Sequence, residues 1–400
     1  MLSIGKRPGP SSRKTVARAQ ARTTRKSRWC QLKAPGWNCQ TRGSLEELIN
    51  SGAGKQLPVV FDFDNTIICG DVSEVTLAVL AKSGLLTARG LAGTLSPPFR
   101  AAGKPRLTLE TASDITEYYR EFLSPTAHGT ADPSPLSNGY VWAVEVMQGL
   151  TPLDVIKATR TAFEWPQSSR PSYIEVTPGK TAFPVPFFYP EMVELMAELL
   201  RHRFEPWIVS AGNVWSIRWM ILHALNPMLR RLGVTRGLRS ENIIGVSTLL
   251  ADRRDQLFKD TLLVRDNKKY AALDERTLAS FRLTSRLQFP VSVYSGKVAC
   301  ILDTIGASPF LCIGDSPGDY PMMGISQNCL WIARLEKPNF QQSLAAHFRR
   351  NGKMKWMIQS TLTGQDAGFV PDLTLLPGRS DRLPKAVRQS LKFLARLSAP

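Results

Sequence analysis

Two carboxylates at the end of an apolar run carry the first chemical signal in this sequence. Asp62 and Asp64 directly follow the apolar residues 59–61, and a single phenylalanine separates them. Two carboxylates this close repel each other and resist removal from water. A fold tolerates them if a cation lies between them, or if one is a nucleophile and the other a general acid and base. A helix cap plus a turn residue is the simpler alternative.

A second acidic pair follows another apolar run. Asp315 and Asp319 lie in the segment 314–319, which reads GDSPGD. Mg²⁺ prefers carboxylate and water oxygens and takes few protein carboxylates. The two glycines would let the backbone turn tightly around an ion. An acidic surface loop is the alternative, but a bound cation would also reduce the repulsion among Asp62, Asp315 and Asp319.

Two further positions suit a phosphate group. Ser210 ends an apolar strand pattern, and Ala211 and Gly212 follow it before a helix pattern. A hydroxyl and free backbone N–H groups at a helix start form an anion site, although Ser210 could also be only a helix cap. Lys297 precedes an apolar helix pattern that leads to Asp315. A buried lysine there would stabilise a phosphoryl group, and an ordinary solvated lysine is the alternative.

These polar residues come where short apolar strands end, and that placement sets the expected fold. Strands are predicted at 58–61, at 207–209 and just before Asp315, and amphipathic helices separate them. Helices that alternate with short apolar strands predict a parallel α/β sheet. Ligands gather at the carboxyl ends of the strands in such sheets. The sequence therefore predicts one site at one edge of the sheet.

Residues 72–184 follow a different pattern, which predicts a mainly helical insert. Helices are expected at 114–123, at 140–150 and at 152–163, the last with Thr151 as its N-cap. Strand signals are few in this region.

The first 45 residues hold eleven lysines and arginines and no acidic residue, out of a net charge of +18. They show no apolar periodicity, so disorder is expected. A solvated tail, an organelle transit peptide and an arm for nucleic acid or another anionic surface all fit this composition. The chain is expected to comprise a basic, disordered segment 1–55, an α/β core formed by 56–71 and 185–400, and a helical insert at 72–184.

Composition narrows the class of protein. No run of about 18 apolar residues occurs, so no membrane span is expected. The six cysteines form no Cys-x-x-Cys pair, which indicates a reduced, cytoplasmic protein, with organelle targeting through the basic segment as the alternative. The four histidines show no ligand spacing, which disfavours zinc. The oligomeric state stays open.

Together, and in this order along the chain, the polar residues resemble the motifs of the haloacid dehalogenase (HAD) superfamily. The resemblance spans roughly residues 56–340 and rests on Asp62-Phe63-Asp64-Asn65-Thr66, on Ser210, on Lys297 and on the segment 314–319. It implies a Rossmann-like catalytic core with a helical cap. It also implies a phosphatase with Asp62 as nucleophile and Asp64 as acid and base, because the dehalogenases of this superfamily lack the second aspartate.

The same resemblance implies a set of ligands. Mg²⁺ would be the cofactor, held by Asp62, the main-chain carbonyl of Asp64 and Asp315, with Asp319 in or near the shell. The implied phosphate-binding residues are Thr66, Ser210, Ala211 and Lys297.

The position of the insert is similar to that of the cap in phosphoserine phosphatases and phosphocholine phosphatase-like proteins. In phosphoserine phosphatases a glutamate nine residues after the nucleophile contacts the substrate amine, and the shorter Asp71 occupies that position here. We therefore expect a small polar, phosphoserine- or phosphocholine-like ester as substrate, with nucleic-acid contacts confined to the basic tail. A phosphotransferase of the same superfamily, or a nucleic-acid-binding protein with an inactive core, is the alternative.

Overall fold

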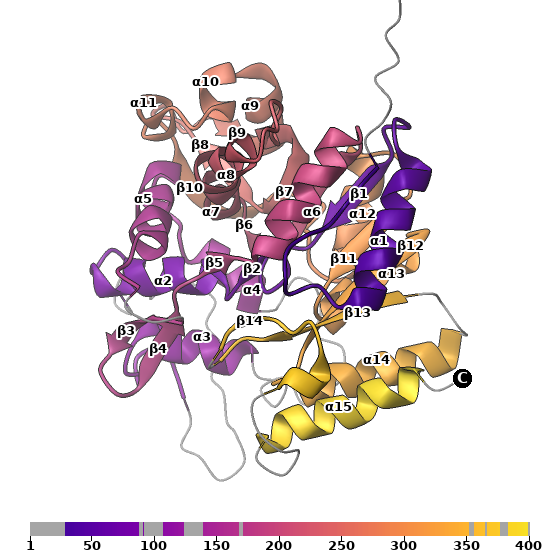
Figure 1. Ribbon diagram of the computed structural model, residues 1–400. Helices are drawn as coiled ribbons and strands as arrows, with labels where there is room; N and C mark the ends of the chain where they lie inside the picture. The colour runs from indigo at the N-terminus through magenta and orange to yellow at the C-terminus, as the bar shows by residue number, and fades with distance from the viewer. Residues whose placement is uncertain are drawn as a thin grey trace, which may run out of the picture.

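A parallel sheet forms the centre of the molecule. The computed structural model describes residues 29–87, 91, 107–123, 139–167, 171–351, 356–364, 366–376 and 383–398. The strands of the central sheet are β1 (Pro58–Phe61), β6 (Glu205–Asn213), β7 (Ile243–Val246), β11 (Leu311–Gly314), β12 (Asn328–Arg334), β13 (Trp356–Leu362) and β14 (Gly368–Phe369). Their order is β14-β13-β12-β11-β1-β6-β7, and only β14 pairs antiparallel (Figure 1). The predicted parallel α/β sheet is confirmed.

Strand β1 lies inside this sheet, between β6 and β11. Val59, Val60 and Phe61 are completely buried, as expected for a strand covered on both faces. Phe61 pairs in register with Ile208 of β6 and Ile313 of β11. Because all three strands run in the same direction, their carboxyl ends meet at one edge of the sheet.

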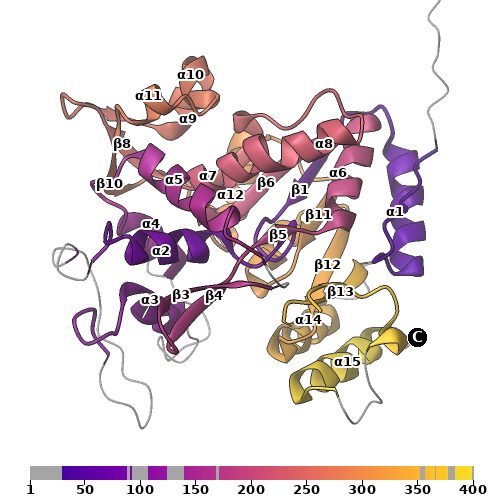
Figure 2. The ribbon, with the colours of Figure 1, turned by 60° about the vertical axis from the view of Figure 1, so that its left-hand side comes forward.

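Helices cover both faces of the sheet. On the face of Val59 and Phe61 the core includes side chains of α1 (Cys39–Gly52), α6 (Pro190–Arg201) and α8 (Asn226–Arg231). On the face of Val60 it includes side chains of α12 (Ser295–Thr304), α13 (Tyr320–Gly324), α14 (Pro338–Asn351) and α15 (Lys385–Ser398). Figures 1 and 2 show α14 and α15 side by side. No described helix has the length and apolar character that a membrane span requires.

The described part of residues 72–184 is mainly helical, as predicted. It contains α2 (Val72–Lys82), α3 (Ile115–Leu123), α4 (Gly139–Glu145) and α5 (Pro152–Phe163), together with an unpredicted hairpin of β3 (Tyr173–Thr177) and β4 (Thr181–Pro184). Thr151 caps α5 as expected, whereas α4 ends at Glu145 and is shorter than the predicted helix at 140–150. In Figures 1 and 2 these elements lie away from α1, across the sheet. The boundary between core and cap stays a prediction.

The expected disorder of residues 1–55 is wrong for the part that the structure describes. Cys30, Leu32 and Trp37 are buried in the core, and Asn38 caps α1 by accepting hydrogen bonds from two backbone N–H groups. The sparse apolar side chains gave no periodic signal, yet backbone N–H groups of this segment donate to Glu191 and Glu194 of α6 and to Gln359 of β13. Residues 1–28, which hold nine of the eleven basic residues, lie outside the described residues.

A second, smaller sheet was not predicted. It consists of β10 (Arg282–Leu287), β8 (Thr248–Ala251) and β9 (Leu257–Phe258), and α9 (Asp260–Asp266), α10 (Lys268–Ala271) and α11 (Glu275–Leu278) accompany it. A buried ion pair ties it to α7 (Val214–Trp219). The two terminal guanidinium nitrogens of Arg218 donate to the two Asp260 oxygens at 2.7 and 2.6 Å. Tyr270 also donates to Asp260 and accepts from Trp215 at 3.0 Å.

Replacing one partner of this ion pair should therefore be costly. We expect Asp260→Ala to lower the free energy of unfolding by about 3–5 kcal/mol, because Arg218 would remain buried without a counter-charge. Chemical denaturation measures the difference. As a control, Asp255→Ala removes the exposed pair with Arg282 and should cost less than about 1 kcal/mol. Equal losses in the two variants would contradict the assigned role of the buried pair.

Candidate active site

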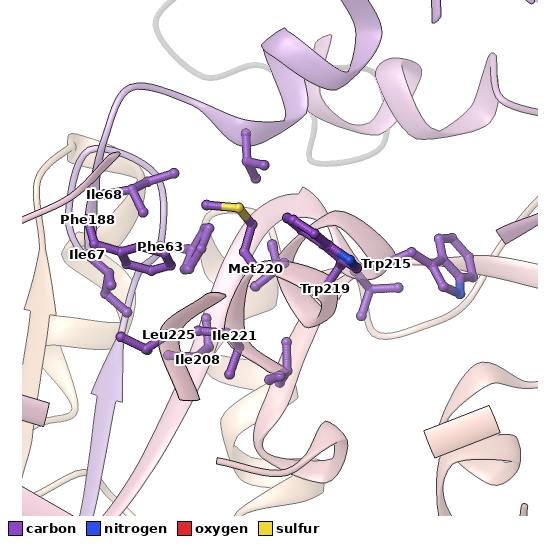
Figure 3. Close-up of a cluster of buried hydrophobic side chains, with 14 of the residues drawn as sticks. Phe63, Ile67, Ile68, Phe188, Ile208, Trp215, Trp219, Met220, Ile221 and Leu225 are labelled. Carbon is purple, nitrogen blue, oxygen red and sulfur yellow. The ribbon is translucent and has the colours of Figure 1, made fainter. Parts of the chain in front are cut away.

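Asp62 lies at the carboxyl end of β1 and is almost fully buried. Its backbone N–H donates to the Ile313 carbonyl of β11 at 2.9 Å, which extends the ladder by one residue. Thr66 donates from its hydroxyl to Asp62 Oδ2 at 3.0 Å. Phe63 lies in the apolar cluster of Figure 3 and anchors the turn that carries both aspartates. Burial raises the pKa of Asp62, an effect that Lys297 opposes and Asp319 increases.

Lys297 bridges two of the carboxylates. Its Nζ donates to Asp62 Oδ1 at 2.7 Å and to Asp319 Oδ1 at 2.6 Å, and its side chain is buried. The preceding Gly296 allows this approach, because a Cβ at that position would lie 1.8 Å from the Val291 carbonyl oxygen. Burial lowers the pKa of Lys297. Asp319 and Asp62 raise it by more than burial lowers it, so the ammonium group stays charged. The alternative of a solvated lysine is therefore wrong.

Asp315 and Asp319 complete a cluster of oxygen ligands. Oxygens of Asp62, Asp315 and Asp319 all lie within 4.8 Å of one another, and all three side chains are buried. Asp319 Oδ2 accepts from the backbone N–H of Asp315 and of Ser316, each at 3.1 Å. A Cβ on residue 314 would lie 2.6 Å from Asp319, so glycine is needed for this tight turn. Buried, oxygen-only and acidic, the cluster fits a hard cation such as Mg²⁺.

Asp64 has a different environment. Its Oδ1 accepts from the backbone N–H of Val72 at 2.7 Å, at the start of α2. Its Oδ2 lies close to Gly212, where an added Cβ would be 2.9 Å away. Burial raises the pKa of Asp64 well above its ordinary value, and the negative charge of Asp71 adds to this effect. Lys297 and Arg334 contact the carboxylates of Asp62, Asp315 and Asp319 but not that of Asp64, so burial favours the protonated form of Asp64.

Ser210 and Ala211 lie within β6, at the same edge of the sheet. Ser210 is buried, its hydroxyl accepts from the Gly212 N–H at 3.0 Å, and its carbonyl accepts from the Ser292 hydroxyl at 2.6 Å. The helix α7 is capped by Asn213, so Ser210 does not act as a helix cap. The strand runs on to Asn213, and Ala211 lies three residues before Val214, the first residue of α7. Phosphate binding by Ser210 and Ala211 stays a prediction.

The side chain of Asp71 caps a helix. Its Oδ1 accepts from the N–H groups of Ser73 and Glu74 at 2.8 and 2.9 Å, at the start of α2. This geometry holds Asp71 next to Asp64, while a role in specificity stays a prediction. Glu74, one turn along, is also partly buried, and burial together with Asp71 raises the pKa of its carboxyl group to about 8.

One prominent site residue, Arg334, was missed by the sequence analysis. It is the last residue of β12, and its Nε lies 2.7 Å from Asp315 Oδ2. The side chain is 13% exposed. Burial raises the pKa of Asp315, and Arg334 opposes that shift. The rule that located the other site residues, a polar residue directly after an apolar strand, applies equally to Arg334.

Comparison with known proteins places the fold. No family model and no curated protein matches the chain. Among solved structures, a conserved protein of unknown function from Anaerococcus prevotii DSM 20548 is 16% identical with a TM-score of 0.57, over 85% of this chain and 97% of that one. The chain shares the fold of that protein.

Weaker structural similarity extends to two hydrolases. A HAD family hydrolase from Salmonella enterica serovar Typhi is 11% identical with a TM-score of 0.35, over 76% of this chain and 74% of that one. A substrate-bound phosphoserine phosphatase is 12% identical with a TM-score of 0.34, over 69% and 86%. These two similarities are too low to argue from, so the function must be inferred from the residues themselves.

The raised pKa of Asp64 predicts how stability depends on pH. A carboxyl group with a raised pKa in the folded state favours folding while protonated, and this contribution is lost as pH rises through the folded pKa. Asp64→Asn cannot ionise and keeps an oxygen for the Val72 N–H. In a chelator, the Tm of Asp64→Asn minus that of the wild type should therefore increase as the pH rises above about 4, the ordinary pKa of an aspartate.

Thermal unfolding at several pH values measures this difference. The exposed Asp303→Asn variant controls for the substitution itself. A difference for Asp64→Asn that stays constant or shrinks with rising pH would rule out the assigned environment of Asp64.

Proposed function

We propose that this protein is a Mg²⁺-dependent phosphomonoesterase of the HAD type that acts through an aspartyl-phosphate. The observation that carries the proposal is the buried cluster of Asp62, Asp315 and Asp319, with Lys297 bridging two of its members. The lysine compensates two buried carboxylates, and one of them is the carboxylate at the end of β1. A nucleophile that must approach an anionic phosphoryl group needs such a positive neighbour.

In the first step an oxygen of Asp62 attacks phosphorus while the bond from phosphorus to the leaving oxygen breaks. Lys297 and the Thr66 hydroxyl hold the two Asp62 oxygens and fix the direction of the carboxylate. Protonated Asp64 gives its proton to the departing alkoxide, so the alcohol leaves neutral. The raised pKa of Asp64 suits this donation.

In the second step Asp64, now ionised, takes a proton from a water molecule whose oxygen attacks phosphorus. The bond between phosphorus and Asp62 breaks, inorganic phosphate leaves, and both aspartates return to their starting states. The N–H groups that follow Ser210, together with Lys297, are proposed to hold the phosphoryl oxygens.

The oxygens of Asp62, Asp315 and Asp319 would hold Mg²⁺, with the main-chain carbonyl of Asp64 as a further proposed ligand. When bound, the ion supplies positive charge that offsets the negative charge of the phosphoryl group and of the carboxylates.

Two isosteric variants separate the proposed roles of the aspartates. Asp62→Asn should lower kcat for p-nitrophenyl phosphate by at least about 10³-fold, because no covalent intermediate forms. Asp64→Asn should release about one nitrophenolate per enzyme molecule in a burst and then stall, because this leaving group departs without a proton but water is not activated. Rapid-mixing absorbance measures both.

The matched control is Asp303→Asn, which should turn over like the wild type. Steady activity of Asp62→Asn would remove the nucleophile from the proposal. A chelator should abolish wild-type turnover, and added Mg²⁺ should restore it.

The surroundings of Asp64 support a leaving group that carries an ammonium. Asp71 and Glu74 lie at the start of α2. The buried Tyr119 hydroxyl has no hydrogen-bond partner among the described residues. Burial raises the pKa of Tyr119, and the negative charges of Asp71 and Glu74 raise it further, which indicates that both acids lie near it. Carboxylates and aromatic rings together suit a substituted ammonium. We therefore propose a phosphoserine- or phosphocholine-like ester as substrate.

Neutralising Glu74 tests this substrate class. Above the pKa of about 8, where Glu74 is ionised, Glu74→Gln should lower kcat/KM for phosphocholine or phosphoserine by about tenfold and leave that for glycerol phosphate nearly unchanged. Asp71→Asn, in which the cap to α2 is kept by the amide oxygen, serves as the paired variant. An equal loss for cationic and neutral esters would count against ammonium recognition but not against phosphatase activity.

The six cysteines of the chain are free, which supports a reducing compartment. We propose the cytoplasm on this ground.

A further inference from the structure

Arg334 contacts a proposed metal ligand. Its Nε lies 2.7 Å from Asp315 Oδ2, yet neither atom makes an aligned hydrogen bond. The guanidinium carbon lies 5.1 Å from the centre of the Phe340 ring. The Arg334 backbone is fixed as well, because it pairs with Thr361 of β13 and its carbonyl accepts from Gln341 at 3.0 Å. The arginine is therefore held beside Asp315 by its strand and by an aromatic ring.

The contact places a fixed positive charge next to the proposed cation site. Asp315 offers an oxygen to the cluster with Asp62 and Asp319, all within 4.8 Å. The side chains of Arg334 and Asp315 are 13% and 3% exposed, so water screens their charges weakly. A divalent ion bound at the cluster would be repelled by the guanidinium charge, because both cations would contact the Asp315 carboxylate. Lys297 differs, because its Nζ bridges the other two carboxylates, Asp62 and Asp319.

We propose that Arg334 competes with the metal for Asp315. The arginine stabilises the metal-free site by compensating a buried carboxylate, and the same charge weakens metal binding, so that the ion stays exchangeable. An arginine that only oriented Asp315 would need a directional hydrogen bond, and the contact does not have that alignment. The inference rests on the proposed function for the identity of the ion.

The test compares metal affinity in the full chain. Mn²⁺ binding to wild type, Arg334→Gln and Arg334→Lys is measured by the loss of the free-ion EPR signal, with Mg²⁺ as competitor. Arg334→Gln should bind Mn²⁺ and Mg²⁺ about tenfold more tightly than wild type, because the opposing charge is gone. Arg334→Lys keeps the charge and should bind as the wild type does. The exposed Arg276→Gln controls for the loss of any arginine.

Thermal unfolding provides a second readout that does not depend on activity. In a chelator, Arg334→Gln should have a lower Tm than wild type, because Asp315 loses its counter-charge. Added Mg²⁺ should raise the Tm of Arg334→Gln more than that of the wild type, since tighter binding to the folded state stabilises it more. Arg334→Lys should show the wild-type gain.

Equal or weaker metal binding by Arg334→Gln would overturn the competition, and with retained activity it would leave the phosphatase proposal standing. If Arg334→Lys bound as tightly as Arg334→Gln, shape rather than charge would decide affinity, and the inference would also fail. If neither the wild type nor any variant bound Mn²⁺ or Mg²⁺, the proposed metal site would be wrong, and the inference would fail with it.

Discussion

The structure depends on compensating several carboxylates that are buried at one edge of the sheet. Removing a carboxylate from water costs several kcal/mol unless charges and hydrogen bonds replace the water. Lys297 compensates the charges of Asp62 and Asp319, and Arg334 compensates the charge of Asp315. Lys297 belongs to α12 and Arg334 belongs to β12. The sheet, the helix and the turn after β11 must therefore assemble before the charges are balanced. The charge balance of the site therefore depends on the assembled core.

The geometry around these carboxylates and cations explains why two positions are occupied by glycine. Residue 296 must lack a Cβ so that α12 can start against the Val291 carbonyl and present Lys297. Residue 314 must lack one so that Asp319 can fold back onto the turn. The carboxylates still outnumber the two buried cations, which leaves the cluster with room for a further positive charge. A divalent ion supplies that charge in a small volume, which a third side chain could not do.

The sequence predicted the parts of the fold that have a local signature. The apolar run before Asp62 predicts a buried strand, and the glycines around Asp315 predict a tight turn. Both can be recognised from the local sequence alone. Arg334 also follows an apolar run, but charged residues commonly follow strands, and its role comes from a contact with Asp315, which is distant in sequence. The segment with Cys30 and Trp37 was misjudged for the same reason, since its burial depends on α6 and β13. The small sheet β10-β8-β9 is antiparallel and joined by short, polar helices, so it lacked the alternation that revealed the main sheet.

The proposed specificity residues are linked to the catalytic edge through buried hydroxyl groups. The hydroxyl of Thr159 on α5 donates to Ser216 of α7 at 2.8 Å, and the hydroxyls of Thr159 and Thr76 on α2 are 2.9 Å apart. All three side chains are fully buried. The backbone N–H of Asn213 donates to the Ser73 hydroxyl at 3.0 Å.

These bonds join α2 to the end of β6 and α5 to α7, so the start of α2 is held close to the strand that carries Ser210. Buried hydroxyls that satisfy one another resist separation, because each would lose its partner without gaining water. Asp71 and Glu74 are therefore fixed relative to Asp64 before any substrate binds. Such preorganisation lets the site distinguish leaving groups without first having to order the side chains that contact them.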